Sequence, residues 1–425
     1  MPPPLTASLT DWLIRLERLH PTAIELGLDR VRRVAGALGL KPDFPLLTVG
    51  GTNGKGSTCA ILEATLGAAG YKIGLYTSPH LLRYNERVRI AGREVGDADL
   101  VAAFEAIESA RGDISLTYFE FGTLAAMHRF IEAGVDVAIL EVGLGGRLDA
   151  VNLWDADAAL VTSVDLDHQD YLGDTREAIG FEKAGIFRAG RPALCADPDP
   201  PASLLQHAQA IGADLRRIGR DFGYARAGAG WTWQGRHTAW PDLPLPAMAG
   251  AYQLRNAAAA LAALETLSAP LPVNVEAIRH GLRQARVPGR FQTIASSPEL
   301  IVDVAHNPEA ARALASALDD AATAGRTFAV IGMLADKDAA GVIAALRGRV
   351  DAWWTCTPDS PRARDAASLA ATIRSCLPEA VVNLATTPVE ALAAAQSAAH
   401  EGDRIVAFGS FTTVAAVLDH AATQQ

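Results

Sequence analysis

The stretch "LLTVGGTNGKGSTCAILEATL", residues 46–66, indicates the fold class of this chain. An apolar run leads into a glycine-rich loop with one lysine, and a helical pattern opened by Ser57 and Thr58 follows. Glycines let a backbone curl close to a ligand, and the N–H groups and dipole of a helix N-terminus favour negative charge. Lys55 adds a cation, and one of the two hydroxyls could hold Mg²⁺. The stretch therefore predicts a strand, a phosphate-binding loop and a helix.

The spacing of this loop differs from that of the common P-loop. There a serine or threonine follows the lysine directly, whereas Gly56 intervenes here. A glycine-rich turn alone is more often a tight turn than a binding site. The strand before it, the helix after it and the lysine inside it together favour a nucleotide triphosphate as the ligand.

The length and the net charge of the chain limit which class of protein it can be. A chain of 425 residues is too long for one compact core, so two domains are expected. Apolar residues make up 49% and charged residues 20%, as in a globular protein, and the net charge of −10 argues against a nucleic-acid partner. Basic residues gather locally in residues 81–93, where a solvated hairpin and a surface for an anionic substrate are both open.

The cysteines and the chain start bear on location. The four cysteines lack metal-ligand spacing, so neither disulfides nor a zinc site are expected, and a reducing cytoplasm fits. Residues 1–13 lack the pattern of a signal peptide, and no apolar run reaches the ~18 residues of a membrane span. We expect a cytoplasmic protein without a membrane partner, and a monomer by default.

Strand-like and helical segments alternate over the first two thirds of the chain. Amphipathic helices are predicted at residues 8–20 and 28–40, and strands at 45–51, 72–78, 136–144, 158–165 and 191–197. Residues 214–246 have the short Trp- and Gly-rich texture of a small antiparallel sheet, and a long alanine-rich helix at 251–267 follows. The alternation predicts βαβ units and a mainly parallel sheet with flanking helices.

A Pro-Gly pair within residues 283–292 interrupts this pattern before it restarts. Further strands are predicted at residues 299–305, 327–334, 351–357, 381–387 and 403–410. The predicted fold class is therefore α/β: a P-loop ATPase domain at residues 1–288, mainly parallel with a small antiparallel sheet, and a smaller Rossmann-like domain at 289–425.

Polar side chains follow the strands of the first domain, where ligands bind in open α/β sheets. They are Ser78, Glu141, Arg147, Asp149, Asn152, Asp165, Asp167 and His168. A serine, a glutamate and a histidine on one rim are a plausible ligand shell for Mg²⁺, although histidine is unusual for that ion. Alternatively, Glu141 caps a loop and His168 bonds a neighbour. Lys183, just after this histidine, is ordinarily interpreted as a solvated or phosphate-facing cation.

Several motifs occur together in one order. They are GTNGKGS (51–57), YTSPHL (76–81), YFEFGTLAAMHRF (118–130), LEVGLGGRLDAVN (140–152), DHQDYLG (167–173), EKAGIF (182–187), PGRFQ (288–292), DVAHNP (303–308) and GSF (409–411). From about Trp12 to Val414 the chain thereby resembles the folylpolyglutamate synthase and dihydrofolate synthase family of Mur-type ligases. The phosphate loop is common to all Mur-type ligases, whereas YTSPHL, LEVGLGGRLDA and DVAHNP together are far more specific. The bacterial bifunctional enzymes are the most similar branch.

The resemblance implies a role for each matching position. The loop residues Thr52, Asn53, Gly54, Lys55, Gly56 and Ser57 would cradle the ATP phosphates, and Asn256, Arg290 and Asp303 would contact the nucleotide. Two Mg²⁺ ions would be held by Ser78, Glu141, His168 and a carbamylated Lys183. The pterin would contact Thr22, Ala23, Ile24, Glu25, Thr117, Tyr118, Phe119, Glu120, Leu148, Asp149 and Ala150. His306 and Ser410 are candidates for the glutamate end of the site, although each could equally cap a loop. The implied catalytic set is Lys55, Lys183, His168 and His306.

The resemblance also implies a reaction. ATP would phosphorylate the carboxylate of dihydropteroate or the γ-carboxylate of a reduced folate, and the α-amine of L-glutamate would displace phosphate from the acyl phosphate. The second domain would close over the first and exclude water. A monofunctional folylpolyglutamate synthase stays open as an alternative.

Three alternative functions can be weighed against this family, and the sequence disfavours each. A peptidoglycan Mur ligase carries an extra N-terminal domain before the phosphate loop, and here the loop begins at residue 50. A P-loop switch or partitioning ATPase would not need a second α/β domain with its own DVAHNP motif. A catalytically dead member acting as a binding module is disfavoured because every expected position is filled.

Overall fold

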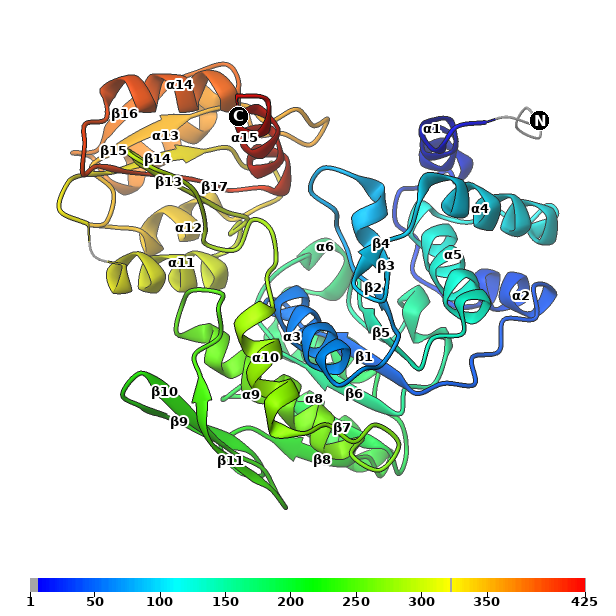
Figure 1. Ribbon diagram of the computed structural model, residues 1–425. Helices are drawn as coiled ribbons and strands as arrows, with labels where there is room; N and C mark the ends of the chain where they lie inside the picture. Colours follow the sequence, from blue (N-terminus) through cyan, green and yellow to red (C-terminus); the bar gives the residue numbers. More distant parts are fainter. Residues whose placement is uncertain (1–6, 322, 425) are drawn as a thin grey trace. The chain divides into compact units, whose positions relative to one another are not determined.

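The computed structural model describes residues 7–321 and 323–424. The chain divides into two compact units, the first formed by Met1–Ala247 with Leu254–Arg286 and the second by Met248–Gln253 with Val287–Gln425 (Figure 1). Each unit is built around its own sheet. The assignment of a P-loop ATPase domain to residues 1–288 and a glutamate ligase domain to 289–425 stays a prediction.

The first unit contains an eight-stranded sheet in the order β4-β3-β2-β5-β1-β6-β7-β8. Its strands are β1 (Leu46–Gly50), β2 (Ile73–Tyr76), β3 (Val88–Ile90), β4 (Arg93–Glu94), β5 (Val137–Glu141), β6 (Ala158–Val161), β7 (Pro192–Cys195) and β8 (Asp214–Arg217). All neighbours pair in parallel except β2 with β3 and β3 with β4, so residues 88–94 form a hairpin that extends the sheet. The predicted mainly parallel sheet is confirmed.

Helices cover this sheet. They are α1 (Leu9–Leu19), α2 (Asp29–Ala37), α3 (Lys55–Ala68), α4 (Asp97–Arg111), α5 (Tyr118–Ala133), α6 (Gln169–Leu172), α7 (Arg176–Ala184), α8 (Ala202–Ala210), α9 (Tyr252–Thr266) and α10 (Val275–Gln284), with 3₁₀ turns η1 (Tyr84–Arg87) and η2 (Ala150–Leu153). Helix α3 packs on β1, β2 and β5, and α10 packs on α3. Helix α5 packs on β2 and β3.

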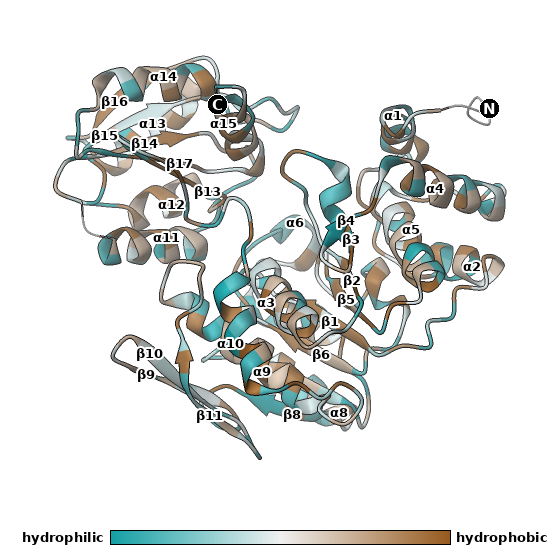
Figure 2. Cartoon of the chain, in the orientation of Figure 1, coloured by the Kyte–Doolittle hydropathy of each residue, from teal (hydrophilic) through white to brown (hydrophobic). Residues whose placement is uncertain are grey.

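Burial explains why the central strands read as continuous apolar runs. Every residue of β1, β5 and β6 is buried, because a parallel sheet is covered on both faces. These strands are mostly white to brown in Figure 2. Residues of β4 are exposed and those of β8 only half-buried, as fits strands at the two edges. These buried strands are held in place by packing on both faces, so the starts of the loops that follow β1, β5 and β6 are held in place as well.

The predicted antiparallel sheet forms, but over a shorter range than expected. Strands β9 (Gly223–Ala227), β10 (Gly230–Gln234) and β11 (Ala239–Pro244) pair antiparallel in the order β11-β10-β9. The prediction is wrong for residues 214–217, which form β8 and pair in parallel with β7. Helix α8 lies between these two strands, so β7-α8-β8 is one more βαβ unit of the large sheet.

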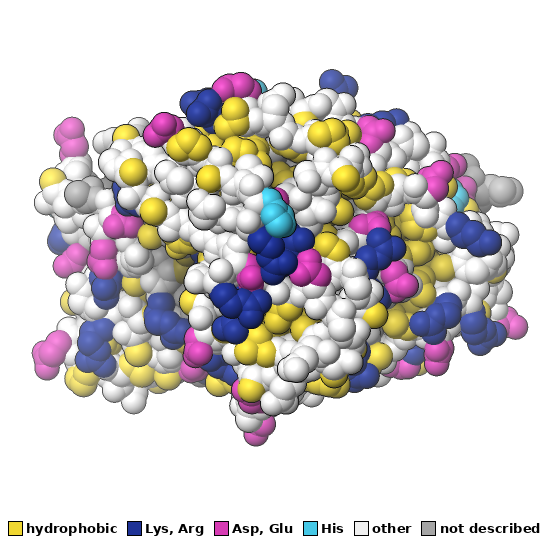
Figure 3. All heavy atoms as spheres, turned by 90° about the horizontal axis from the view of Figure 1, so that it is seen from below, with side chains coloured by type: hydrophobic (Ala, Val, Ile, Leu, Met, Phe, Trp, Pro, Cys, Tyr) yellow, Lys and Arg dark blue, Asp and Glu magenta, His cyan; other side chains and the backbone are white. Residues whose placement is uncertain are grey.

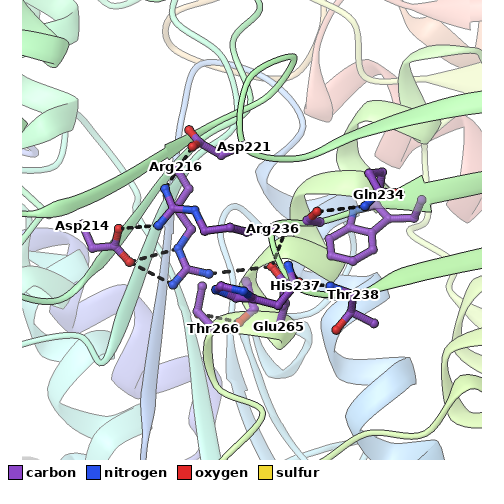
Figure 4. Close-up of polar contacts among 12 residues, drawn as sticks. Asp214, Arg216, Asp221, Gln234, Arg236, His237, Thr238, Glu265 and Thr266 are labelled. Carbon is purple, nitrogen blue, oxygen red and sulfur yellow. Dashed lines mark hydrogen bonds and ion pairs between the residues drawn. The ribbon is translucent and has the colours of Figure 1, made fainter.

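A buried carboxylate ties the β10–β11 turn to helix α9. Glu265 Oε1 accepts hydrogen bonds from the backbone N–H groups of His237 (3.0 Å) and Thr238 (3.0 Å), and Arg216 lies 3.7 Å from Oε2. Figure 4 shows this group beside Arg236, which pairs with Asp214 and Asp221. The small sheet is thus fastened to the edge of the large one by charges as well as by apolar packing.

We predict that Glu265→Ala lowers the free energy of unfolding by about 2 kcal/mol, because the N–H groups of His237 and Thr238 lose their acceptor and Arg216 loses one of its two carboxylate partners. Urea unfolding followed by circular dichroism measures the change. Glu276→Ala is the control: the Glu276 side chain is 73% exposed and pairs with Arg279 one turn away, so a change within about 0.5 kcal/mol is expected. Equal effects of the two variants would contradict the role given to Glu265.

The second unit is a six-stranded sheet in the order β12-β13-β17-β14-β15-β16. Its strands are β12 (Gln292–Ser296), β13 (Glu299–Asp303), β14 (Thr327–Ile331), β15 (Ala352–Thr355), β16 (Val381–Leu384) and β17 (Arg404–Phe408), and its helices are α11 (Pro308–Asp320), α12 (Ala339–Ala345), α13 (Ala366–Cys376), α14 (Pro388–Ala398) and α15 (Phe411–Thr423). Helices α11 and α12 lie on one side of the sheet, and α14 and α15 on the other (Figure 1). The Rossmann-like fold class is confirmed. Antiparallel β12, which follows the Pro-Gly pair, was not predicted.

The surface shows intermixed charge. On the face in Figure 3, dark-blue basic and magenta acidic side chains alternate, and neither sign forms a continuous patch on that face. Among the residues that the structure describes, no helix is long and apolar enough to cross a membrane.

Candidate active site

The glycine-rich loop follows β1 and opens α3 as predicted. Gly54 precedes the helix with φ +88°, and a Cβ there would lie 2.5 Å from the Asn256 side-chain oxygen. Any other residue would meet both a strained backbone and a clash. Asn256 is buried, so the structure brings one predicted nucleotide contact against the loop.

Lys55 is the first residue of α3. Its Nζ donates to the carbonyl oxygens of Gly51 (2.9 Å) and Thr52 (3.2 Å), so the ammonium group lies against the loop backbone. The first N–H groups of a helix have no intrahelical partner. Cation, helix N-terminus and loop therefore converge, and together they suit an oxyanion such as phosphate.

Thr162 and Ser163, which follow β6, hold the backbone of the glycine-rich loop in place. The sequence did not predict this role for them. Thr52 N donates to Ser163 O (2.8 Å), Asn53 N donates to Ser163 Oγ (3.1 Å), and Thr162 Oγ1 donates to Asn53 O (2.6 Å). The available signal was the Thr-Ser pair at the end of an apolar strand. These side chains support the loop backbone and leave its inner surface to the ligand.

Two predicted metal ligands lie together beside the loop. Ser78 N donates to Glu141 Oε2 (3.1 Å), which joins the ends of neighbouring strands β2 and β5. Glu141 Oε1 lies 3.9 Å from where a Cβ on Gly56 would be. Glu141 is 5% exposed, so a cation beside its carboxylate would offset the buried charge. A hard oxygen donor and a hydroxyl at a phosphate loop fit Mg²⁺.

The other two predicted ligands lie on separate elements. His168 precedes α6 in the left-handed region (φ +52°), with Nε2 4.0 Å from Asp167 Oδ2. Lys183 is buried near the end of α7. Within residues 7–321 and 323–424, no three side chains among His, Cys, Asp and Glu group as metal ligands. A site of the predicted kind thus depends on Ser78 and on a modified Lys183, and the roles of His168 and Lys183 stay predictions.

Asp149 lies in the predicted substrate segment 148–150 and is buried. Its carboxylate accepts from Leu144 N (2.8 Å) and Val151 N (3.0 Å), which shapes the glycine loop after β5 and caps η2. Burial raises the pKa of Asp149 to about 7, although these backbone bonds act in the opposite direction. The residue therefore titrates near neutral pH.

This raised pKa predicts a pH-dependent stability. Because the folded-state pKa of about 7 exceeds the ordinary 3.8, the folded protein keeps a proton that the unfolded chain releases. The contribution is complete below pH about 4 and is lost as pH rises through about 7, by on the order of 4 kcal/mol. Urea midpoints between pH about 5 and about 8 should fall less steeply in Asp149→Asn than in the unmodified protein. Asp113→Asn, at an exposed loop position, should keep the original slope, and an unchanged slope in Asp149→Asn would refute the assignment.

The predicted pterin segments 22–25 and 117–120 belong to separate elements of the first unit, an irregular segment before α2 and the start of α5. Thr117 and Glu120 form a capping box at the start of α5, in which Glu120 N donates to Thr117 Oγ1 (3.2 Å) and Thr117 N donates to Glu120 Oε2 (2.8 Å). Tyr118 and Phe119 remain half-buried. Both polar side chains therefore have a structural task at the helix start, and the pterin roles of the two segments stay predictions.

The remaining predicted residues belong to the second unit. Asp303, at the end of β13, accepts from Phe291 N (2.8 Å) and Ala305 N (2.7 Å), and burial raises its pKa. The Arg290 guanidinium lies 5.5 Å from the Phe411 ring centre, and the His306 ring lies 6.1 Å from it. Arg290, Asp303 and His306 thus gather around the start of α15.

Ser410 has the capping role that was left open for it. Its Oγ accepts from Thr413 N (3.0 Å) at the first turn of α15. The His306 ring nitrogen Nδ1 donates to Val304 O (2.8 Å), which fixes the ring. Binding roles for both residues stay predictions.

A phosphate loop on one α/β unit, followed by a second Rossmann-like unit, is the architecture of a Mur-type ligase. The Mur ligase middle domain matches residues 49–264, and the Mur ligase glutamate ligase domain matches residues 289–411. Both matches agree with the class that the loop and fold define.

Comparison with individual proteins narrows the class. The dihydrofolate synthase/folylpolyglutamate synthase of Escherichia coli is 48% identical over 418 residues, 98% of this chain and 96% of that protein. The structure of E. coli FolC in complex with DHPP and ADP aligns over 100% of both chains, with a TM-score of 0.95 and 46% identity. The Yersinia pestis bifunctional enzyme complexed with AMPPNP and Mn ion aligns over 100% of both chains at TM-score 0.92 and 47% identity.

The chain belongs to the dihydrofolate synthase/folylpolyglutamate synthase family of Mur ligases. The resemblance noted in the sequence is confirmed.

Proposed function

We propose that this protein is an ATP-dependent amide ligase that joins L-glutamate to dihydropteroate and to the γ-carboxylate of reduced folates. The observation that carries the proposal is the phosphate loop with Lys55 at its mouth and the Ser78–Glu141 pair beside it. Family membership over nearly the whole chain supports the choice of substrates. The same residues suit the other Mur ligases, so the substrate rests on the family.

The chemistry follows from the poor reactivity of a carboxylate. A carboxylate oxygen attacks the γ-phosphorus of ATP, the bond to ADP breaks, and an acyl phosphate forms. The α-amine of glutamate then attacks the acyl carbon, phosphate leaves with the former carboxylate oxygen, and the amine loses a proton. An acyl phosphate hydrolyses in water, so the site must exclude water during the reaction.

Residues of this chain would stabilise the negative charge of the phosphates during the reaction. The Lys55 ammonium and the α3 N-terminus would stabilise charge on the transferring phosphoryl group. Mg²⁺, held by Glu141 and Ser78 and, on the family pattern, by His168 and a carbamate on Lys183, would neutralise phosphate oxygens. Arg290 and Asp303 would contact the nucleotide, and His306 and Ser410 would bind glutamate, from the second unit. We further propose a cytoplasmic monomer, which four free thiols suit.

The test is ATP- and Mg²⁺-dependent incorporation of radiolabelled glutamate, run in parallel with dihydropteroate and with tetrahydrofolate. Both substrates should accept glutamate, with ADP and phosphate formed in equal amounts. If dihydropteroate is inert while tetrahydrofolate is glutamylated, the protein is a folylpolyglutamate synthase alone. If neither reacts, the proposed function is refuted.

A further inference from the structure

One arginine joins the two segments assigned to the pterin. Arg30, on α2, pairs with Glu25 through Nη1, and its Nη2 lies 3.1 Å from Glu120 Oε1. The same Nη2 donates to the backbone oxygen of Glu25 (2.9 Å). A single guanidinium thereby holds residue 25 and the first turn of α5 at a fixed separation.

The α5 side of this link is rigid. Glu120 is 3% exposed and already closes the capping box with Thr117. A carboxylate so deeply buried is stable only with an opposite charge beside it. Arg30, whose side chain is 23% exposed, supplies that charge. Arg30 is therefore held at the start of α5, and it holds its other partner, Glu25, at a fixed distance from that helix.

The other side is a segment without regular structure. Residues 21–27 form neither helix nor strand, and besides the bond from Gly27 N to Leu148 O (3.3 Å) side-chain bonds hold them. His20 Nε2 bonds Glu25 Oε2 (2.8 Å), and His20 Nδ1 bonds Ser115 Oγ (2.8 Å), which itself donates to Leu19 O (3.2 Å). The hydrogen bond from His20 is the largest cause of a lowered pKa of Glu25, and the charge of Arg30 lowers it further. Glu25 thus stays ionised and available to Arg30.

We propose that Arg30 is a positioning residue for the pterin end of the substrate. The two Nη atoms of its guanidinium group hold the segment at residues 22–25 against the start of α5 at 117–120. They thereby determine the width of the site that both segments line. The inference rests on the proposed function, which assigns those segments to the pterin. Lysine cannot replace arginine here, because an ammonium group carries the charge but lacks the planar pair of N–H donors that bonds both carboxylates.

The experiment compares Arg30→Ala and Arg30→Lys with Arg15→Ala. Arg15 is the matched control: its side chain is 22% exposed and pairs with Glu108 between α1 and α4, and neither residue belongs to a predicted pterin segment. We expect the KM for dihydropteroate to rise about tenfold or more in Arg30→Ala and in Arg30→Lys, because misplacement of a binding segment weakens substrate positioning. The KM for ATP should stay within about twofold in all three variants, because the phosphate loop is untouched.

Equilibrium binding of dihydropteroate and of a non-hydrolysable ATP analogue gives a readout without turnover. Arg30→Ala removes the charge beside the buried Glu120 and should lower the melting temperature, whereas Arg30→Lys keeps a positive charge there and should melt close to Arg15→Ala. Selective loss of dihydropteroate binding in Arg30→Lys therefore supports the positioning role. A parallel rise in the KM for ATP, glutamate and dihydropteroate would reduce Arg30 to a purely structural residue, and an unchanged KM for dihydropteroate would overturn the inference. Both results leave the proposed function intact, whereas an inactive unmodified protein refutes the function itself.

Discussion

Lys55→Ala should reduce glutamate incorporation by roughly 1,000-fold or more, since it removes the cation facing the transferring phosphate. The Lys55 ammonium group bonds two loop carbonyls, 2.9 and 3.2 Å away, and is not part of the apolar core. The variant should therefore fold. Initial rates with saturating tetrahydrofolate, together with circular dichroism and melting temperature, measure both effects.

Lys72→Ala is the matched control for this prediction. Lys72 Nζ also donates to a backbone carbonyl, that of Ala133, but lies at the opposite end of β2 from Ser78. It should retain near-normal rates. A folded Lys55→Ala with normal turnover would show that the loop does not use its lysine for phosphate.

Lys183→Ala should lose most activity, and Lys183→Arg should be equally inactive. The family pattern places a carbamate at Lys183, which turns a cation into a carboxylate. An ammonium group at ~4 Å from Mg²⁺ would repel it by several kcal/mol at an effective dielectric constant near 20. A carbamate reverses that sign and offers the oxygen ligands that Mg²⁺ prefers. Lys183 is only 4% exposed, so solvent screens a charge at this position little.

Chemical rescue distinguishes the carbamate from a plain lysine. Acetate, which can fill the space left in Lys183→Ala, should restore part of the activity and lower the Mg²⁺ concentration needed. Arginine keeps the positive charge but does not form this carbamate, so Lys183→Arg should not respond to acetate. An active Lys183→Arg would mean that the site uses the cation itself.

The sequence predicted most of the fold because its signals are local. Residues 46–66 combine an apolar strand, glycines and a helix start, and the structure has β1, the loop and α3 there. Residues 214–217 were misassigned because a four-residue polar strand has no periodicity that separates a parallel edge from an antiparallel sheet. Only pairing with β7 decides that difference.

By itself, the sequence determined the α/β class, the phosphate loop, Lys55 and the family, since each is written in contiguous motifs. The tertiary structure decided which distant residues support them. The Thr162–Ser163 pair after β6 holds the loop, Glu141 accepts from Ser78 N just after the neighbouring strand, and Arg30 bonds Glu25 and also Glu120, which lies 90 positions further along the sequence. No local pattern encodes such contacts, because they depend on strand order and helix packing, which bring separate segments together only after the chain has folded.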